Sequence, residues 1–369
     1  MNIILGITGS VASTVMYKLR KELIDSGNEV KLVVTEKAKL FIPEKEYCYY
    51  YYDDAYDFDN RYCSDPMFKD VLDKSIKHIE LRDWADCMVI APCSANTLAK
   101  ISYGMCDNLL TSIVRAWDWD KPFYIAPAMN TKMFEHPVTI ESINRIEQWG
   151  VKIIYPTSNV LACGDIGIGA MAHIKTIANI VNGHQWNLDW FKMEFLPLEN
   201  HPGGFGTIRK ECYHTGVDIY MDIYSLVGAV EDGEIVSIGQ FTGEAVGCGW
   251  WNDTWQVTVK GRSGNICYGE IKVNKKLKVG DKVKAGQPLG DVMQVLKNAP
   301  KKYIPYHKVS MLHLELMNDD LIEVPDWKIG CKKHKSLLDP TPYLYLQTHS
   351  DSHDPKIRIR MSQNELPKD

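Results

Sequence analysis

Apolar residues in the first half of the chain form short runs that alternate with helix-like stretches. The runs predict buried strands at Asn2–Ile7, Val30–Thr35, Met88–Ala91, Phe123–Ala126 and Val151–Tyr155. The helix-like stretches are Val11–Ser26, Ala95–Tyr103, Asn108–Ala116, Ile140–Gln148 and Ile174–Val181. Strands that alternate with helices in this way predict right-handed crossovers and a parallel sheet covered on both faces. We therefore expect a three-layer, Rossmann-like α/β domain over residues 1–183.

The pattern changes after Gly183. Residues 184–202 are rich in Trp, Asn and Pro and predict a linker or a wrapping segment. Beyond them, short β-type runs separated by glycine turns occur at Ile235–Gln240, Trp255–Val259, Ile266–Val273, Lys282–Gly290 and Met311–Met317. Such spacing, with little helical periodicity, predicts a compact all-β domain over residues 203–347, followed by a tail over residues 348–369.

Composition narrows the functional classes. The 369 residues are 45% hydrophobic and 24% charged, enough apolar material for a core in each half. The net charge of −5 and the absence of a basic stripe argue against nucleic-acid binding. No apolar run approaches the roughly 20 residues of a membrane span, and the N-terminus lacks a signal-peptide pattern. The ten cysteines form no CxxC pair, so we expect reduced thiols in a cytoplasmic protein.

The first candidate site is the turn after the first predicted strand. Gly9 lets the backbone approach an anion, and Ser10 together with free helix N–H groups can hold a phosphate. The alternative is a glycine used only for tightness of the turn, and the pattern alone leaves both open.

Four later segments change this balance, and three of them follow predicted strands, where ligand-binding loops gather. The segments are His78–Asp86, Ala91–Thr97, Ala126–Met133 and Ala162–Met171. In this order they resemble the HIxL–AD, PASANT, PxMNxxMW and ACGxxGxG motifs of the flavin-containing cysteine decarboxylases, and within them the enzymes of coenzyme A biosynthesis. Cys93 replaces the alanine of the second motif, and Phe134 replaces the tryptophan of the third.

The resemblance implies an FMN-dependent lyase that converts phosphopantothenoylcysteine to phosphopantetheine. Direct loss of CO2 from a cysteine carboxylate would leave an unstabilised carbanion, whereas prior oxidation of the thiol by a flavin supplies an electron sink. By the same resemblance, His78 is the acid/base group, Asn130 binds the substrate carboxylate, and Met133, Ala128 and Gly164 contact the substrate. The structural alternatives are a helix-start hydrogen bond for His78, a turn for Asn130 and core packing for Met133.

The resemblance also assigns the cofactor site and the assembly. The residues that it places on FMN are Gly9, Ser10, Val11, Thr35, Ser94, Ala95, Asn96 and Thr97. Enzymes of this family are homotrimers or larger assemblies with the flavin between subunits, so a trimer is implied.

Cys163 separates two chemistries within the family. In the coenzyme A branch the cysteine of ACGxxGxG protonates the enethiol intermediate, and the reaction is redox-neutral overall. Peptide cysteine decarboxylases stop at the oxidised enethiol and lack this cysteine. Cys163 therefore favours the complete reaction, while the alternative is a buried thiol in a glycine-rich lid.

Segments of the second half resemble the lysostaphin-like zinc endopeptidases. The matching pieces are Phe205–Arg209, His214–Ile219, Val227–Gly233, Val279–Gln287, Leu312–Leu316 and Asp339–Leu344. The resemblance implies a zinc site made by His214, Asp218 and His313, a ligand set that leaves one position open. Met311 and Glu270 stand where the family has its catalytic histidines, so we expect a degenerate scaffold. Its expected role is contact with a peptide or a glycan.

Three other functions stay open. One is a peptide cysteine oxidative decarboxylase, against which Cys163 argues. Another is a non-catalytic flavin-binding or regulatory protein. The third is a peptidoglycan endopeptidase in which Glu270 acts as the base. The tryptophans Trp250, Trp251 and Trp255 would supply an aromatic contact surface in the second half or, alternatively, ordinary β-core packing.

Overall fold

The computed structural model describes residues 1–42, 51–53, 76–191, 195–198, 201–209, 212–297, 310–324 and 326–350. The chain divides into two compact units, Met1–Gly183 (unit 1) and His184–Asp369 (unit 2). Within the described ranges, none of the helices combines the length and the apolar character that crossing a bilayer requires. Each unit is described by itself below.

Unit 1 is built on a parallel sheet of six strands in the order β3-β2-β1-β4-β5-β6. The strands are β1 (Asn2–Ile7), β2 (Glu29–Val34), β3 (Tyr51–Tyr52), β4 (Cys87–Cys93), β5 (Phe123–Pro127) and β6 (Lys152–Ile153). β4 and β5 are buried at every position, because helices cover both faces of the sheet. The predicted parallel α/β domain is confirmed.

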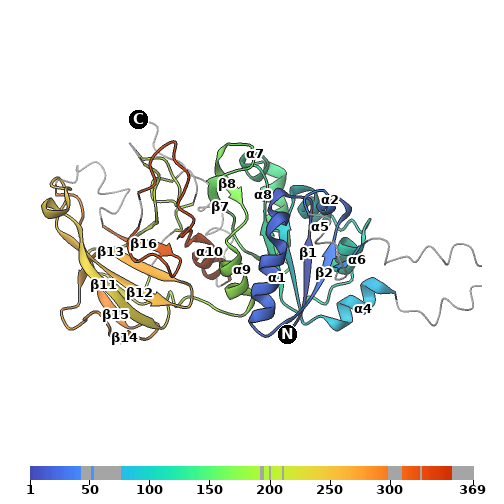
Figure 1. The fold of residues 1–369 in the computed structure, drawn as a ribbon, viewed down its shortest axis with the longest axis horizontal. Helices are drawn as coiled ribbons and strands as arrows, with labels where there is room; N and C mark the ends of the chain where they lie inside the picture. The colour runs from blue at the N-terminus through green and yellow to red at the C-terminus, as the bar shows by residue number, and fades with distance from the viewer. Residues whose placement is uncertain are drawn as a thin grey trace, which may run out of the picture. The chain divides into compact units, whose positions relative to one another are not determined.

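The helices form the two outer layers of unit 1. They are α1 (Met16–Asp25), α2 (Glu36–Lys39), α4 (Lys77–Trp84), α5 (Ala95–Ser102), α6 (Leu109–Arg115), α7 (Thr131–Phe134), α8 (Pro137–Glu147) and α9 (Ile174–Val181). α1 packs on α9, whereas α5 packs on α6 and α8, and α4 packs on α6. Figure 1 shows α1 and α9 on the opposite side of β1 and β2 from α4 and α6. Right-handed crossovers in both directions from β1 produce this division.

Two parts of unit 1 differ from the sequence prediction. The expected helix Val11–Ser26 begins with a 3-10 turn, η1 (Val11–Val15), before α1 starts at Met16. The ACGxxGxG segment forms an antiparallel hairpin, β7 (Thr157–Val160) and β8 (Ile166–Ala170). Its alternating glycines conceal the β pattern, because glycine lacks the side chain on which strand periodicity rests.

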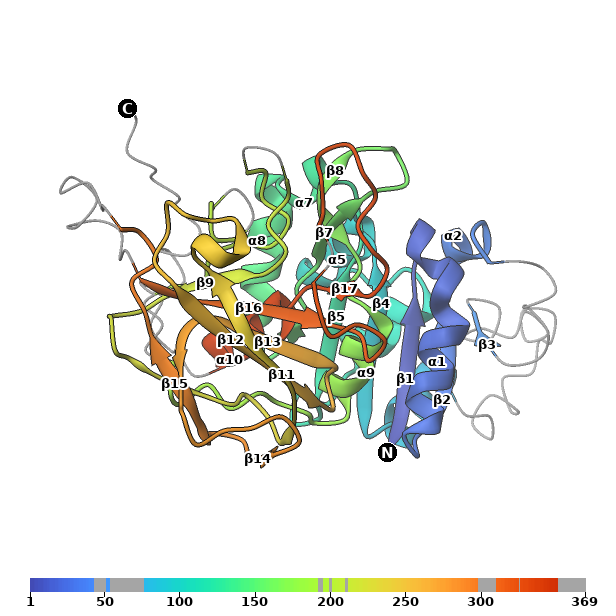
Figure 2. The same ribbon diagram turned by 60° about the vertical axis from the view of Figure 1, so that its left-hand side comes forward.

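Unit 2 consists largely of antiparallel strands, of which Figure 2 shows β11, β12, β13 and β16 together. The strands are β9 (Val217–Tyr220), β10 (Leu226–Gly228), β11 (Gly233–Thr242), β12 (Thr254–Gly261), β13 (Asn265–Val273), β14 (Lys282–Val283), β15 (Pro288–Val292), β16 (Met311–Met317) and β17 (Leu337–Leu338). A 3-10 turn, η5 (Glu244–Val246), follows β11. The expected run Lys282–Gly290 is split into β14 and β15 by a turn at Gly286.

The strand β13 changes its partner along its length. Residues 265–269 pair with β16, whereas residues 271–273 pair with β15. Glu270 lies at the change and has a φ of 62°, a left-handed conformation that is unusual for a side chain of this size. Its pairing with β12 is also irregular, since the register shifts between Trp255 and Val257. Such a bulge redirects a side chain.

The described residues of the expected linker, within the range 184–202, pack on the rest of unit 2. Trp186 is buried, stacks on Tyr343 with ring centroids 4.6 Å apart, and donates a hydrogen bond to Ser263 Oγ at 2.9 Å. His184 bonds to Glu231 and, at 3.1 Å, to Ser263. These contacts fit a wrapping segment and not a free connection.

At the other end of unit 2, α10 (Thr341–Ser350) is a helix that the sequence pattern did not predict. It runs past residue 347, where we expected the tail to begin. Residues 351–369 of that tail lie outside the described part.

Candidate functional site

A cavity of 1340 Å³ lies within unit 1, lined by the loops that follow β1, β2, β4 and β5 and by the hairpin β7–β8. These loops meet at the carboxyl edge of the sheet, where β1 and β4 are neighbours although β2 and β3 intervene in sequence. Ligands of open α/β sheets bind at such a reversal of strand order. The volume exceeds that of an ordinary small-molecule pocket, which is about 300–1,000 Å³.

The loop after β1 is held by Thr8, a buried residue that the sequence analysis did not select. Its hydroxyl donates to the Pro92 carbonyl at 2.9 Å and accepts from the Ser94 N–H at 2.8 Å. Its carbonyl accepts from the Ser13 hydroxyl at 2.7 Å. One side chain therefore fixes the loop after β1 against the loop after β4.

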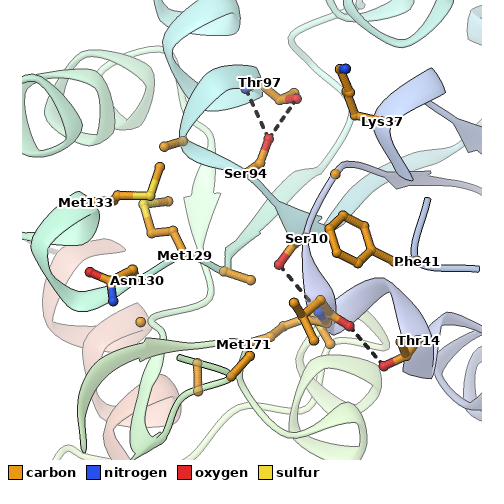
Figure 3. A pocket seen from close by; sticks show the side chains of 18 of the residues that line it. Ser10, Thr14, Lys37, Phe41, Ser94, Thr97, Met129, Asn130, Met133 and Met171 are labelled. Atoms are coloured by element: carbon orange, nitrogen blue, oxygen red, sulfur yellow. Dashed lines mark hydrogen bonds between the residues drawn. The ribbon is translucent and has the colours of Figure 1, made fainter. Parts of the chain in front are cut away.

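Ser10 and Ser94 begin the helical turns that face the cavity (Figure 3). The Ser10 hydroxyl accepts from the Ala12 N–H, and the Ser94 hydroxyl accepts from the Thr97 N–H, both at 3.4 Å. Ser94 also donates to the Thr97 hydroxyl at 3.3 Å. Helix N-termini carry free N–H groups and favour anions, so this side of the cavity suits a phosphate or another anionic group.

The loop after β2 closes against the loop after β1. Thr35 precedes α2, and its N–H and hydroxyl both donate to the Ile7 carbonyl, at 3.0 and 3.4 Å. A Cβ added to Gly9 would lie 2.7 Å from the Cβ of Lys37, so only glycine permits this approach. Gly9 therefore allows a close approach of two loops and also lines the cavity, and its role in binding stays a prediction.

Apolar side chains enclose the cavity from opposite sides. In Figure 3, Met129 and Met133 lie on one side of Ser10 and Ser94, and Phe41 lies on the other. Such side chains present the flat, polarizable surface that an aromatic ring system prefers. Met133 is 49% exposed and so is not the core filler that was its alternative.

Asn130 and Cys163 come together, although they are 33 residues apart. Asn130 precedes α7, and its Oδ1 accepts from the Lys132 N–H at 2.9 Å. Its Nδ2 donates to Cys163 Sγ at 3.2 Å and to Asp165 Oδ2 at 3.1 Å. The Cys163 thiol donates to the same Asp165 oxygen at 3.2 Å. These hydrogen bonds, from Cys163 and then Asn130, hold the pKa of the Asp165 carboxyl below its usual value.

Glycines allow the hairpin that carries Cys163 to lie in close contact with the loop after β5. Gly169 has a φ of 130°, and a Cβ there would lie 2.3 Å from the Met129 carbonyl oxygen. The Met129 N–H donates to the Gly169 carbonyl at 2.9 Å. At Gly167 a Cβ would lie 2.7 Å from the Thr131 hydroxyl. The glycines of ACGxxGxG thus let the hairpin lie against the loop after β5 and the start of α7.

Most of the residues that sequence reasoning selected line this cavity. They are Gly9, Ser10, Val11, Thr35, Ser94, Ala95, Asn96, Thr97, Ala128, Asn130, Met133 and Cys163. Gly164 lies in the hairpin turn beside Cys163 but outside the lining, and His78 lies on α4, also outside it. Sequence reasoning missed Thr8 and Asp165; the signal for Asp165 was an acid two positions after the thiol.

Unit 2 brings together the three predicted metal ligands. In the strand register His313 of β16 lies opposite Asp218 of β9. His313 Nδ1 is 2.7 Å from Asp218 Oδ1, and His214 Nε2 is 3.2 Å from both of these atoms. All three side chains are buried, and one ligand atom from each lies within 4.8 Å of the others. Two imidazoles and a carboxylate are a ligand set that zinc accepts.

Charged neighbours surround this cluster. Arg209 forms an ion pair with Asp218, and His313 Nε2 lies 2.9 Å from Glu315 Oε1. Burial alone would raise the pKa of Asp218, but the charges of His214 and His313 hold it well below its usual value. Burial likewise disfavours a charged His313, yet Glu315 and Asp218 raise its pKa to about 10. The cluster thus holds positive partners for its carboxylates within the chain itself.

The charges of the same cluster also affect the pKa of Glu270. Burial is the main cause that raises its pKa to about 8, and the charge of Asp218 adds to it. Its Oε2 has no hydrogen-bond partner among the described residues. A buried, unpaired carboxyl oxygen in a strained backbone conformation is rare and often marks a functional position.

The tryptophans of unit 2 are exposed to different degrees. Trp250 and Trp255 are 68% and 38% exposed, and the Trp250 and Trp251 rings meet edge to face at 6.2 Å. Core packing therefore does not account for Trp250.

Comparisons with known proteins identify relatives of unit 1. The chain is 43% identical over 177 residues to phosphopantothenoylcysteine decarboxylase of Mus musculus, which covers 47% of this chain and 82% of the relative. It is 44% identical over 183 residues to phosphopantothenoylcysteine decarboxylase HAL3 of Malus domestica, covering 48% and 80%. Among solved structures, a PPC decarboxylase mutant complexed with pantothenoylaminoethenethiol matches 49% of this chain and 96% of its own, with 39% identity and a TM-score of 0.43.

The family assignment rests on half of the chain. Residues 1–185 match the Flavoprotein family, and this range contains the whole parallel sheet and every residue of the cavity. The chain belongs to the Flavoprotein family.

Proposed function

We propose that this chain is an FMN-dependent decarboxylase that converts phosphopantothenoylcysteine to phosphopantetheine. The observation that carries the proposal is the meeting of Asn130 and Cys163 at the rim of a cavity lined by Ser10 and Ser94. Relatives of which the chain covers 82% and 80% are named for this activity. A peptide cysteine decarboxylase, the related alternative, would not need the Cys163 thiol.

The described residues fit FMN. The cavity offers helix starts at Ser10 and Ser94 for the phosphate, and Met129, Met133 and Phe41 for an aromatic ring system. Gly9 and Gly169 leave room where a Cβ would fill the approach of one loop to another. FMN, when bound, would accept the electron pair that the substrate thiol gives up and would return it to the product, so that the overall reaction is redox-neutral.

The chain's own groups then have separate tasks. The Asn130 amide binds the substrate carboxylate and so orients it at the rim of the cavity. Cys163 supplies a proton to the product side of the reaction. Met133 and Ala128, which line the same cavity, and Gly164 beside Cys163 contact the substrate.

His78 requires a second copy of the chain in this scheme. Because His78 lies outside the cavity of its own unit 1, we assign it to the site of a neighbouring copy. The proposed assembly is a homotrimer in the cytoplasm with FMN between subunits. The proposed domains are residues 1–183 and a β domain that runs from residue 203 through α10, with the segment 184–202 wrapped on it where it is described.

The test is mass spectrometry of the products formed from phosphopantothenoylcysteine by the full chain loaded with FMN. The parent should give phosphopantetheine. Cys163→Ser should lower its formation by about 100- to 10,000-fold, as the loss of a general acid does, and release a product two hydrogens poorer. The control is Cys331→Ser, which changes another exposed cysteine, in unit 2.

Three results would redirect the proposal. If the parent itself stops at the product two hydrogens poorer, the chain is an oxidative cysteine decarboxylase. If the parent binds flavin and leaves the substrate untouched, it is a flavin-binding protein for which this substrate is wrong. If Cys163→Ser behaves as the parent does, Cys163 is not the acid.

For unit 2 we propose a zinc site made by His214, Asp218 and His313 on a degenerate peptidase-like scaffold that contacts a peptide or a glycan. The convergence of the three ligand atoms within 4.8 Å supports the site. The burial of all three ligands and the replacement of the catalytic histidines by Met311 and Glu270 support the loss of endopeptidase activity.

Metal analysis of the dialysed chain tests the zinc site. The parent should retain one zinc per chain, and His214→Gln should retain none, whereas the control His334→Gln should match the parent. Zinc at a hundredfold excess over its Kd should stabilise the parent by about 2.7 kcal/mol. A parent that takes up no zinc, or a His214→Gln variant that keeps it, rules out this site. Hydrolysis of peptidoglycan by the zinc-loaded parent would instead show that the scaffold is not degenerate.

A further inference from the structure

Every polar atom of the Asn130 side chain already has a partner within the chain. Its Oδ1 accepts from the Lys132 N–H and so caps α7. Its Nδ2 carries two hydrogens, and the two acceptors within reach are Cys163 Sγ and the Asp165 carboxylate. The amide proposed to bind the substrate carboxylate therefore has no free donor while Asp165 stays in place.

We propose that Asp165 is a positioning residue whose carboxylate occupies the place of the substrate carboxylate on Asn130 and leaves when substrate binds. This inference rests on the proposed function of Asn130. Both groups are carboxylates that accept from the same amide, and two like charges on one donor repel each other. Binding of the substrate carboxylate therefore disfavours the contact with the Asp165 carboxylate more than the contact with the Cys163 thiol.

The hairpin can release Asp165 without losing its own attachment. Asp165 is exposed, at the end of the turn closed by the hydrogen bond from the Leu161 N–H to the Asp165 carbonyl at 2.7 Å. Gly164 beside it has a φ of 91° and no atom within 4 Å of a built Cβ, so the turn has space around it. The hairpin is fastened elsewhere, where Gly169 meets Met129.

The exchange also acts on Cys163, because Asp165 accepts from its thiol. While Asp165 is on Asn130, the thiol proton points to the carboxylate and the sulfur accepts from the amide. When the substrate carboxylate is lost as CO2, Asn130 regains a donor, and Asp165 can return with Cys163 in its original orientation. Asp165 therefore distinguishes a ligand that carries a carboxylate from one that does not.

Calorimetric titration of the FMN-loaded full chain with two ligands tests this exchange. The first ligand is phosphopantothenoylserine, which carries the carboxylate but has a hydroxyl in place of the thiol. The second is phosphopantetheine, which lacks the carboxylate. In Asp165→Ala, the Kd of the first should fall by about three- to tenfold, because the competing occupant is gone. The Kd of the second should stay within about twofold of the parent.

Two further variants support the comparison. Asp165→Asn keeps an oxygen that accepts from Asn130 but removes the charge, so its Kd for phosphopantothenoylserine should fall between those of Asp165→Ala and the parent. Glu141→Gln removes an exposed charge on α8, outside the cavity lining, and should match the parent. Retention of FMN absorbance shows that each variant has folded.

Steady-state kinetics adds a second readout. Asp165→Ala should lower the KM for phosphopantothenoylcysteine, without a matching rise in kcat, because Cys163 loses its hydrogen-bond acceptor.

The inference is overturned if the Kd values of both ligands move together, or if that of phosphopantothenoylserine rises. If the parent turns over phosphopantothenoylcysteine but Asp165→Ala binds as the parent does, only this inference fails. If the parent neither binds the two ligands nor turns over substrate, the proposed function fails.

Discussion

Unit 1 and unit 2 each bring together the polar residues selected from the sequence, but these residues line a cavity in unit 1 and are buried in unit 2. In unit 1 the selected side chains line a cavity of 1340 Å³, and several, including Cys163, are exposed to it. In unit 2 the selected side chains are buried and bond to one another, with Arg209 and Glu315 as further partners. The first arrangement leaves room for a ligand the size of a cofactor, whereas the second brings three possible ligand atoms within 4.8 Å of one another.

The difference shows that a matching set of residue types does not by itself specify an active site. The cavity of unit 1 combines hydrogen-bond donors, apolar walls and space, so a ligand can reach the polar side chains that line it. The cluster of His214, Asp218 and His313 satisfies its own charges. The side chains of this cluster form a buried ion-pair network among themselves and with Arg209 and Glu315.

The largest expected effect is a loss of activity when the hairpin of unit 1 is moved away from Asn130. In Gly169→Ala the new Cβ would meet the Met129 carbonyl oxygen at 2.3 Å, so the hairpin with Cys163 must move away from Asn130. Misplacement of a reacting group by about 1 Å can lower a rate about a hundredfold, and we expect at least that loss in kcat/KM for phosphopantothenoylcysteine.

The control for Gly169 is Gly150→Ala. Gly150 also has a positive φ, 91°, but nothing lies within 4 Å of a built Cβ. It should share the backbone strain of about 1–2 kcal/mol and keep its activity. Equal activity losses in the two variants would mean that strain, and not the contact with Met129, explains the effect.

A smaller effect is expected from the buried charge of unit 2. Burial and Asp218 raise the pKa of Glu270 from 4.5 to about 8. Between these values the folded state keeps a proton that the unfolded chain has released, so stability falls as the pH rises from about 5 to 8. Each pKa unit corresponds to roughly 1.4 kcal/mol, which gives a decrease on the order of a few kcal/mol.

Glu270→Gln removes this titration while keeping the shape of the side chain. In urea unfolding with a chelator present, it should match the parent near pH 5 and exceed its stability at pH 8. Glu234→Gln, at an exposed position of β11, should follow the parent at both values. A parent and a Glu270→Gln variant with the same pH dependence would show that Glu270 ionises normally in the fold.

Sequence reasoning succeeded where the signal was local. The continuous apolar runs of β1 and β4 and the glycine–serine turn after β1 are readable within a few residues, and the structure places them as expected. The hairpin β7–β8 was missed because glycines occupy the positions at which a strand shows its alternation. The helix α10 was missed because the Pro-rich segment before Tyr343 lacks a helical apolar pattern.

The sequence by itself determined the alternation of strands and helices in unit 1, the change to β structure after Gly183 and the identity of 12 of the 33 residues that line the cavity. Only the tertiary structure decided that Thr8 joins two loops across 84 residues, that Asp165 reaches Asn130, and that Glu270 is buried where the charge of Asp218 affects its pKa. The physical reason is the range of the interactions. Periodicity and turn chemistry act between near neighbours, whereas these contacts depend on which strands pair and where a pairing changes partner.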